Sequence, residues 1–206
     1  NRYFYQEFGL FFLGLYNAAV IFTQFILIFS DFGITAGLTY QIAKYRVSNP
    51  DYTIKLAQSG FFVSIIIFLF FIFFLGYFLQ NPIFLAFLDI ENLKNYSIIY
   101  FLIIGMLISI PKNVLGSILM GYNFPHIWSY LNLFANFINL FGLIITLNYG
   151  FSSYVIGYVY IGTNVLSFLI FAFCIIFYTN YSILLAKLNF KSLAKIYKYS
   201  LKIYLG

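Results

Sequence analysis

Long runs of hydrophobic residues alternate with short polar segments along the chain. Helices are favoured over barrel strands because runs such as residues 64–75 show no alternation with a period of two. A membrane-spanning helix needs about 20 apolar residues, whereas a barrel strand needs about 10 that alternate. The pattern predicts five helical spans, at about residues 10–35, 56–79, 96–120, 127–147 and 153–178.

Local breakers and short links separate the predicted spans. The first span is expected to continue as a less apolar helix to about Tyr45. The Asn-Pro pair at residues 81–82 should end the second span, and residues 148–150 the fourth, whereas Pro111 lies within the third. The links are too short for a separate soluble domain. We therefore expect residues 1–178 to form one transmembrane bundle.

The composition supports a membrane protein. Hydrophobic residues make up 63% of the chain and charged residues only 8%, and residues 113–186 contain no Asp, Glu, Lys or Arg. A soluble fold could not leave such stretches without charge. This excludes a soluble enzyme, a disordered tail and a nucleic-acid-binding domain.

With a single Cys and a single His, the sequence offers no disulfide and no metal-ligand cluster, so we expect no cofactor. The predicted fold class is an all-α, polytopic helical membrane protein.

Lysine and arginine mark one side of the membrane. With five crossings, residues 46–55, 121–126 and 179–206 fall on the positive side, and residues 80–95 and 148–152 on the other. The positive-inside rule places the C-terminus in the cytoplasm and the N-terminus outside.

Since the sequence has no initiator Met or signal peptide and ends like the approach to another span, we expect a piece of a longer chain. A natural five-span protein is the alternative.

Polar and small residues recur inside the spans at helical spacing, so each set should share one helix face. In the first span, Asn17, Gln24 and Asp31 are each seven residues apart. The later stripes are Gly105, Ser109, Lys112 and Gly116; Ser129, Asn132, Asn136, Asn139 and Thr146; and Ser153, Gly157, Tyr160, Asn164 and Ser167.

Two interpretations of these stripes remain open. They form tight helix–helix seams, or they line a shared hydrated cavity. For a cavity, the candidate substrate-binding residues are Asn17, Gln24, Asp31, Lys112, Asn132, Asn136, Asn139 and Asn164.

Asp31 and Lys112 are the ionisable residues that lie clearly inside spans, at comparable depth in the cytoplasmic half. An isolated charge at the centre of a span costs about 2.5–3.5 kcal/mol. We expect either a mutual ion pair or a cavity that opens to the cytoplasm. The structural alternatives are snorkelling of Lys112 to the interface and a helix-end role for Asp31, which Gly33 and Gly37 follow.

The C-terminal segment is basic and amphipathic. Its lysines recur at steps of four, four, three and four residues, from Lys187 to Lys202, and so share one helix face. This pattern predicts a helix on the cytoplasmic leaflet that is attracted to anionic lipids. Alternatively, some of these lysines attract an anionic substrate to a cavity mouth.

Residues 8–46 carry a more specific pattern. Gly14 and Tyr16 lie near the start of the span, Ser-Asp-Phe-Gly-Ile follows at residues 30–34, and Lys44 and Arg46 close the segment. This pattern resembles the polysaccharide and O-antigen flippases of the multidrug/oligosaccharidyl-lipid/polysaccharide exporter superfamily. Two looser similarities are found at residues 121–123, like that family's fourth-to-fifth-helix turn, and at residues 198–206, like the approach to its seventh helix.

The resemblance implies a bacterial inner-membrane transporter with roughly 12 to 14 helices in two lobes. This chain would supply most of one lobe, with the second lobe downstream in the same chain. Such proteins move undecaprenyl-pyrophosphate-linked oligosaccharides across the membrane by alternating access, usually coupled to an ion gradient, here H⁺ or Na⁺. In this hypothesis Lys112 offsets the pyrophosphate charge, the Asn residues of the fourth span bind sugar hydroxyls, and Asp31 closes the cavity or carries the ion.

Other functions remain as alternatives. A multidrug exporter of the same superfamily would favour aromatic and acidic linings. A membrane glycan polymerase would favour large outside loops with Arg, His or Asp clusters, but the outside links here are short. In a non-catalytic scaffold the stripes would be seams only. We expect a transporter rather than an enzyme.

Overall fold

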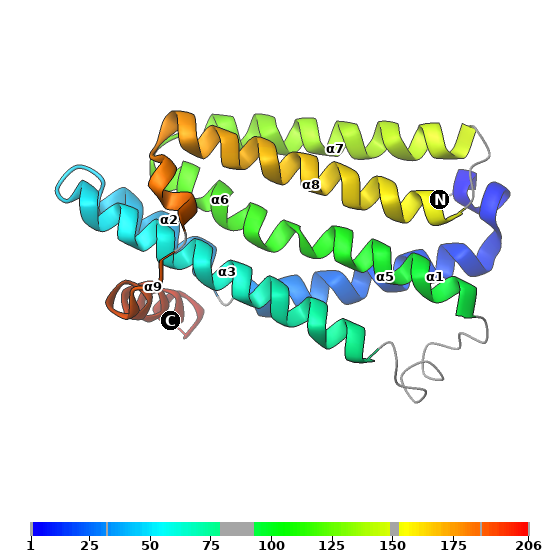
Figure 1. The fold of residues 1–206 in the computed structure, drawn as a ribbon, viewed down its shortest axis with the longest axis horizontal. Helices are drawn as coiled ribbons and strands as arrows, with labels where there is room; N and C mark the ends of the chain where they lie inside the picture. Colours follow the sequence, from blue (N-terminus) through cyan, green and yellow to red (C-terminus); the bar gives the residue numbers. More distant parts are fainter. Residues whose placement is uncertain (1, 32, 79–92, 149–152, 186, 206) are drawn as a thin grey trace.

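A computed structural model shows the fold of the protein (Figure 1) and describes residues 2–31, 33–78, 93–148, 153–185 and 187–205. Within these ranges all regular structure is helical, which confirms the predicted all-α class. The helices are α1 (Arg2–Asp31), α2 (Ile34–Tyr45), α3 (Pro50–Phe78), α5 (Leu93–Leu107), α6 (Ser109–Gly121), α7 (Pro125–Asn148), α8 (Ser153–Tyr178) and α9 (Phe190–Leu205), with a 3-10 turn at Tyr181–Leu185 before α9.

The protein is a multi-pass membrane protein. In the described part of the chain, four helical segments are long and apolar enough to cross a bilayer: Pro50–Tyr77, Tyr100–Gly121, Pro125–Thr146 and Val155–Tyr178. The bent pair α1–α2 raises this to five if it is one span, the number that the hydropathy pattern predicts. The predicted breakers at residues 81–82 and 149–150 lie outside the described residues.

The predicted continuous helix from the first span to Tyr45 is wrong, because the chain bends between α1 and α2. The segments Tyr16–Asp31 and Ile34–Tyr45 meet at 41°. Gly33 lies at the bend with φ 73° and ψ 12°, a left-handed conformation. Glycine adopts it without a steric penalty because it has no Cβ.

The third predicted span is also interrupted, between α5 and α6 at Ile108. Pro111 has no N–H to offer the carbonyl of Leu107, so the hydrogen-bond ladder lacks one rung there. The two halves remain aligned well enough that Tyr100–Gly121 counts as a single candidate span.

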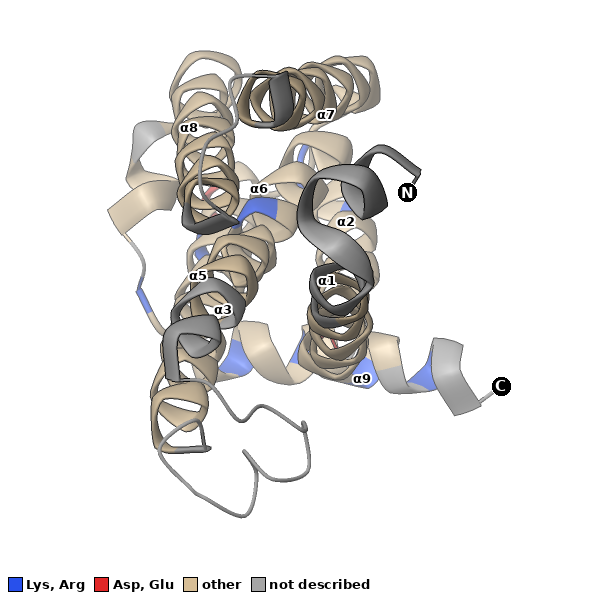
Figure 2. Cartoon of the chain, turned by 90° about the vertical axis from the view of Figure 1, so that its right-hand side faces the viewer, with Lys and Arg blue, Asp and Glu red and all other residues tan. Residues whose placement is uncertain are grey.

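The spans run side by side along the long axis of the molecule, and α9 crosses them (Figures 1 and 2). The core of the bundle lies where α2 meets α3 and α6, at Leu38, Ile42, Leu56, Leu115 and Leu119. A second core cluster joins α1, α3, α5 and α8 and includes Ala19, Leu75, Leu102, Leu107 and Ile156. These two clusters determine which face of each helix points toward the interior of the bundle.

The segments that the charge pattern assigns to one side of the membrane meet at one end of the bundle. The hydroxyl groups of Thr53 and Tyr122 are 3.1 Å apart. The Gln58 side-chain amide donates to the backbone carbonyl of Ser182 at 2.7 Å. This arrangement agrees with the predicted alternation of crossings, while the cytoplasmic identity of this end remains a prediction.

Small residues let the backbones approach at the α5–α8 seam. A Cβ atom on Gly105 would lie 3.0 Å from the carbonyl carbon of Tyr160 and 3.0 Å from the amide nitrogen of Ile161. Backbone atoms cannot move aside without separating the helices. Gly105 therefore acts as a seam residue rather than as part of a cavity lining.

We predict that Gly105→Leu will destabilise the folded protein by about 1–3 kcal/mol, because the added side chain must push α5 and α8 apart. Gly76→Leu is the matched control, since a Cβ at Gly76 meets no atom within 4 Å. Thermal unfolding of both variants in detergent micelles measures the difference. Equal midpoints for the two variants would contradict the seam.

Candidate functional site

A polar hollow lies inside the bundle. It has a volume of about 280 Å³, and helices α1, α5, α6, α7 and α8 all contribute to it. We call it the polar hollow. Its lining residues are Tyr16, Val20, Thr23, Gln24, Leu27, Met106, Ser109, Lys112, Asn136, Asn139, Tyr160 and Asn164.

The volume of the polar hollow, about 280 Å³, limits what it can hold. Small-molecule sites usually measure about 300–1,000 Å³, so the polar hollow lies near the lower limit. It has room for one sugar or phosphate unit rather than for a whole oligosaccharide.

The polar hollow brings together most of the sequence-predicted site residues. Gln24, Lys112, Asn136, Asn139 and Asn164 all line it. They come from four helices, and each lies at the helical position that the stripes predict. Residues of these stripes therefore meet at a common cavity. Other residues of the same stripes, such as Gly105, instead form the contact between neighbouring helices.

Several polar groups of the hollow are held in place by neighbouring helices. The Asn139 side-chain oxygen accepts a hydrogen bond from the Thr163 hydroxyl. The Asn164 amide donates to the Tyr160 carbonyl at 2.9 Å, and the Tyr16 and Tyr160 hydroxyls are 2.5 Å apart. The Asn139 NH₂ group and the Asn164 oxygen stay available for a ligand, because neither has a partner among the described residues.

Gln24, Lys112 and Asn136 have no side-chain hydrogen-bond partner within the described part of the chain. Lys112 is half-buried, whereas Gln24 and Asn136 are exposed on α1 and α7. These two helices flank the same side of the bundle (Figure 2). Because hydrocarbon cannot satisfy amide groups, this side must face water or further protein.

Asn17 and Asn132 do not line the polar hollow. Asn17 is exposed on α1, seven residues before Gln24. Asn132 is half-buried on α7, one turn before Asn136. By helical spacing, each shares a helix face with a residue that lines the polar hollow, but each lies at a different depth along its helix.

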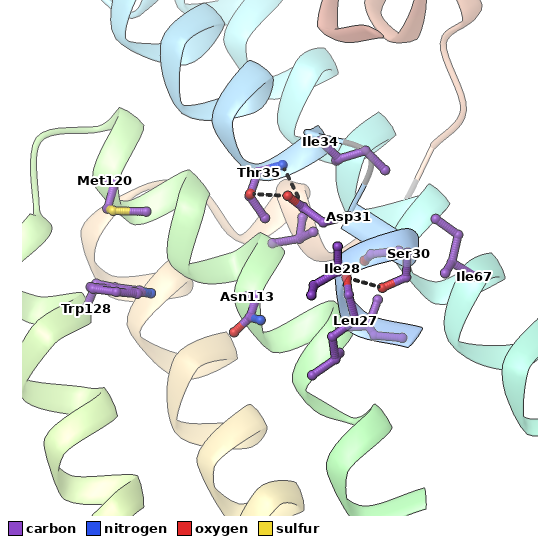
Figure 3. Close-up of a pocket in the computed structure, with 13 residues that line it drawn as sticks. Leu27, Ile28, Ser30, Asp31, Ile34, Thr35, Ile67, Asn113, Met120 and Trp128 are labelled. Atoms are coloured by element: carbon purple, nitrogen blue, oxygen red, sulfur yellow. Dashed lines mark hydrogen bonds between the residues drawn. The ribbon is translucent and has the colours of Figure 1, made fainter. Parts of the chain in front are cut away.

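Asp31 lies in a second hollow of 370 Å³, which we call the Asp31 hollow (Figure 3). Its carboxylate accepts hydrogen bonds from the Thr35 backbone N–H at 3.1 Å and from the Thr35 hydroxyl at 2.9 Å. Asp31 therefore caps the first turn of α2 across the bend, which is the helix-end role. Other residues that line this hollow include Ser30, Asn113, Met120 and Trp128.

An ion pair between Asp31 and Lys112, one of the two arrangements expected for these charges, is not found among the described residues. The two side chains line different hollows, which share Leu27 in their linings. Thr35 supplies the partners of the Asp31 carboxylate instead. Similar depth along two helices does not bring two side chains together, because the rotation of each helix is set by its core residues.

Sequence reasoning missed Asn113 and the Tyr16–Tyr160 contact. Asn113 is polar, lies within a span and follows Lys112 directly, so it carried a usable signal. The two tyrosines are separated by 144 residues, and nothing local to either position indicates that they meet.

Comparison of the chain with protein-family models, with curated proteins and with solved structures returns no match. The resemblance to flippases is therefore an expectation from the sequence pattern at residues 8–46.

We predict that a cysteine at Asn136 will react with a water-soluble maleimide added to both sides of the membrane, in a Cys174→Ala background. Its thiolate forms readily only where water reaches it. Phe137→Cys is the matched control, because Phe137 is 58% exposed on the apolar outer face of α7 and should contact lipid. Equal labelling of both positions would contradict a hydrated hollow.

Proposed function

We propose that the protein is one lobe of a flippase that moves an undecaprenyl-pyrophosphate-linked oligosaccharide across the bacterial inner membrane, for surface polysaccharide or O-antigen biosynthesis. The observation that carries the proposal is the polar hollow, in which a lysine and several amides converge inside an apolar bundle. The resemblance of residues 8–46 to flippases gives separate support.

The chemistry of the hollow suits a sugar phosphate. The Lys112 ammonium can offset phosphate charge and donate hydrogen bonds to its oxygens. The amides of Asn136, Asn139 and Gln24 can donate to and accept from sugar hydroxyls. The polyprenyl tail would remain in lipid beside the open flank between α1 and α7.

Alternating access requires a second wall, which in this proposal is a second lobe of the same chain. It would cover the exposed amides of Gln24 and Asn136. The two lobes would then open the cavity first to one side of the membrane and afterwards to the other.

A multidrug exporter is the second candidate, and the Asp31 hollow favours it. That hollow combines a carboxylate with the indole of Trp128. Carboxylates and aromatic faces both attract organic cations. The two candidates therefore depend on different hollows and respond to different substitutions.

We predict that Lys112→Ala will weaken binding of a disaccharide-linked polyprenyl pyrophosphate to the complete protein in nanodiscs by about tenfold or more. A hydrogen bond to a charged group contributes about 1.5–3 kcal/mol. Lys112→Arg keeps the charge and should retain most of the binding. Lys55→Ala removes an exposed lysine of α3 and should change little.

The same binding measurement separates the flippase from the multidrug exporter. Unchanged binding in Lys112→Ala would contradict the flippase proposal. Binding of a hydrophobic organic cation that is lost in Asp31→Asn but retained in Lys112→Ala would favour the exporter.

A further inference from the structure

Helix α9 lies across the spans rather than along them (Figure 2). Its lysines at positions 191, 195, 198 and 202 are all exposed, whereas Ser192, Ile196 and Ser200 are buried against the bundle. A helix that crosses the spans near one end of them has the orientation of an interfacial helix.

The buried face of α9 is fitted closely to α2. A Cβ on Gly37 would lie 2.5 Å from the Ser200 hydroxyl and 2.8 Å from the Ile196 carbonyl oxygen. The Tyr40 and Tyr199 rings stack at 3.8 Å between centroids. This face of α9 is therefore occupied by α2, which leaves the lysine-bearing face of α9 open to its surroundings.

Ser200 connects α9 to the α1–α2 bend. Its hydroxyl donates to the backbone carbonyl of Gly33 at 2.6 Å, and Gly33 is the left-handed residue of the bend. Asp31 and Thr35 flank the bend and line the Asp31 hollow. Burial raises the pKa of Tyr197 on α9, and the Asp31 carboxylate raises it further, so the helix lies close to that carboxylate.

Cations from α2 and α9 meet around one aromatic ring. The ammonium groups of Lys44 and Lys195 both lie 5.4 Å from the centroid of the Tyr45 ring. Lys195 is also 4.7 Å from the Tyr52 ring. The basic face of α9 thus continues onto the end of α2.

We propose that the basic face of α9, together with Lys44, binds the phosphate headgroups of anionic phospholipids and thereby holds the α1–α2 bend. Charge complementarity and the interfacial orientation identify the partner. Each lysine near an anionic membrane surface strengthens the association roughly fivefold. The lipid contact would regulate the shape of the Asp31 hollow through Ser200 and Gly33, whichever cargo the protein carries.

Hydrogen–deuterium exchange of the whole chain tests this proposal, in nanodiscs of phosphatidylcholine alone or with phosphatidylglycerol as about a third of the lipid. We expect the anionic lipid to slow exchange in α9 and at residues 33–37. Replacing Lys191, Lys195, Lys198 and Lys202 by Gln should remove this slowing and leave exchange in phosphatidylcholine unchanged. Replacing the same lysines by Arg should retain it.

Ser200→Ala tests the connection to the bend. In this variant the anionic lipid should still slow exchange in α9 but no longer at residues 33–37. The proposal is overturned if the native chain exchanges equally in both lipids, if the Gln variant keeps the response, or if the bend in Ser200→Ala responds as in the native chain.

Discussion

The arrangement of this bundle depends on the penalty for leaving polar groups in hydrocarbon. Apolar residues cover most of the outer surface of α3, α7 and α8, whereas amides concentrate on facing sides of α1, α7 and α8. Core residues such as Leu102 and Ile156 rotate the helices so that these amides meet Lys112 at the polar hollow. Since Gln24 and Asn136 stay exposed, the hollow is complete only with water or further protein on that flank.

The bend between α1 and α2 is the point where interactions from α1, α2 and α9 come together. Asp31 satisfies the first turn of α2, Gly33 supplies the left-handed conformation, and Ser200 binds the Gly33 carbonyl from α9. These three residues thus link α2, α9 and the Asp31 hollow at one point of the chain. The polar hollow and the bend are neighbours, because Leu27 lines both hollows.

The positions of the spans could be predicted from sequence because run length and hydropathy act locally. The faces of the Asn and Gln residues could also be predicted, because helical spacing fixes them. The bend at Gly33 could not, because its stability depends on α9, which lies far along the chain. The choice between an Asp31–Lys112 ion pair and a cavity could not be made from sequence, since depth along two helices gives no information on how each helix is rotated.

Spin labels at neighbouring positions of α1 test the hydrated flank most directly. Gln24 faces the polar hollow, whereas Phe25 is 60% exposed on the apolar outer surface. In membranes, a nitroxide at position 24 should collide mainly with a water-soluble nickel complex, and one at position 25 mainly with dissolved oxygen. Oxygen-dominated collisions at both positions would show that the amide stripe faces lipid and would contradict the hydrated hollow.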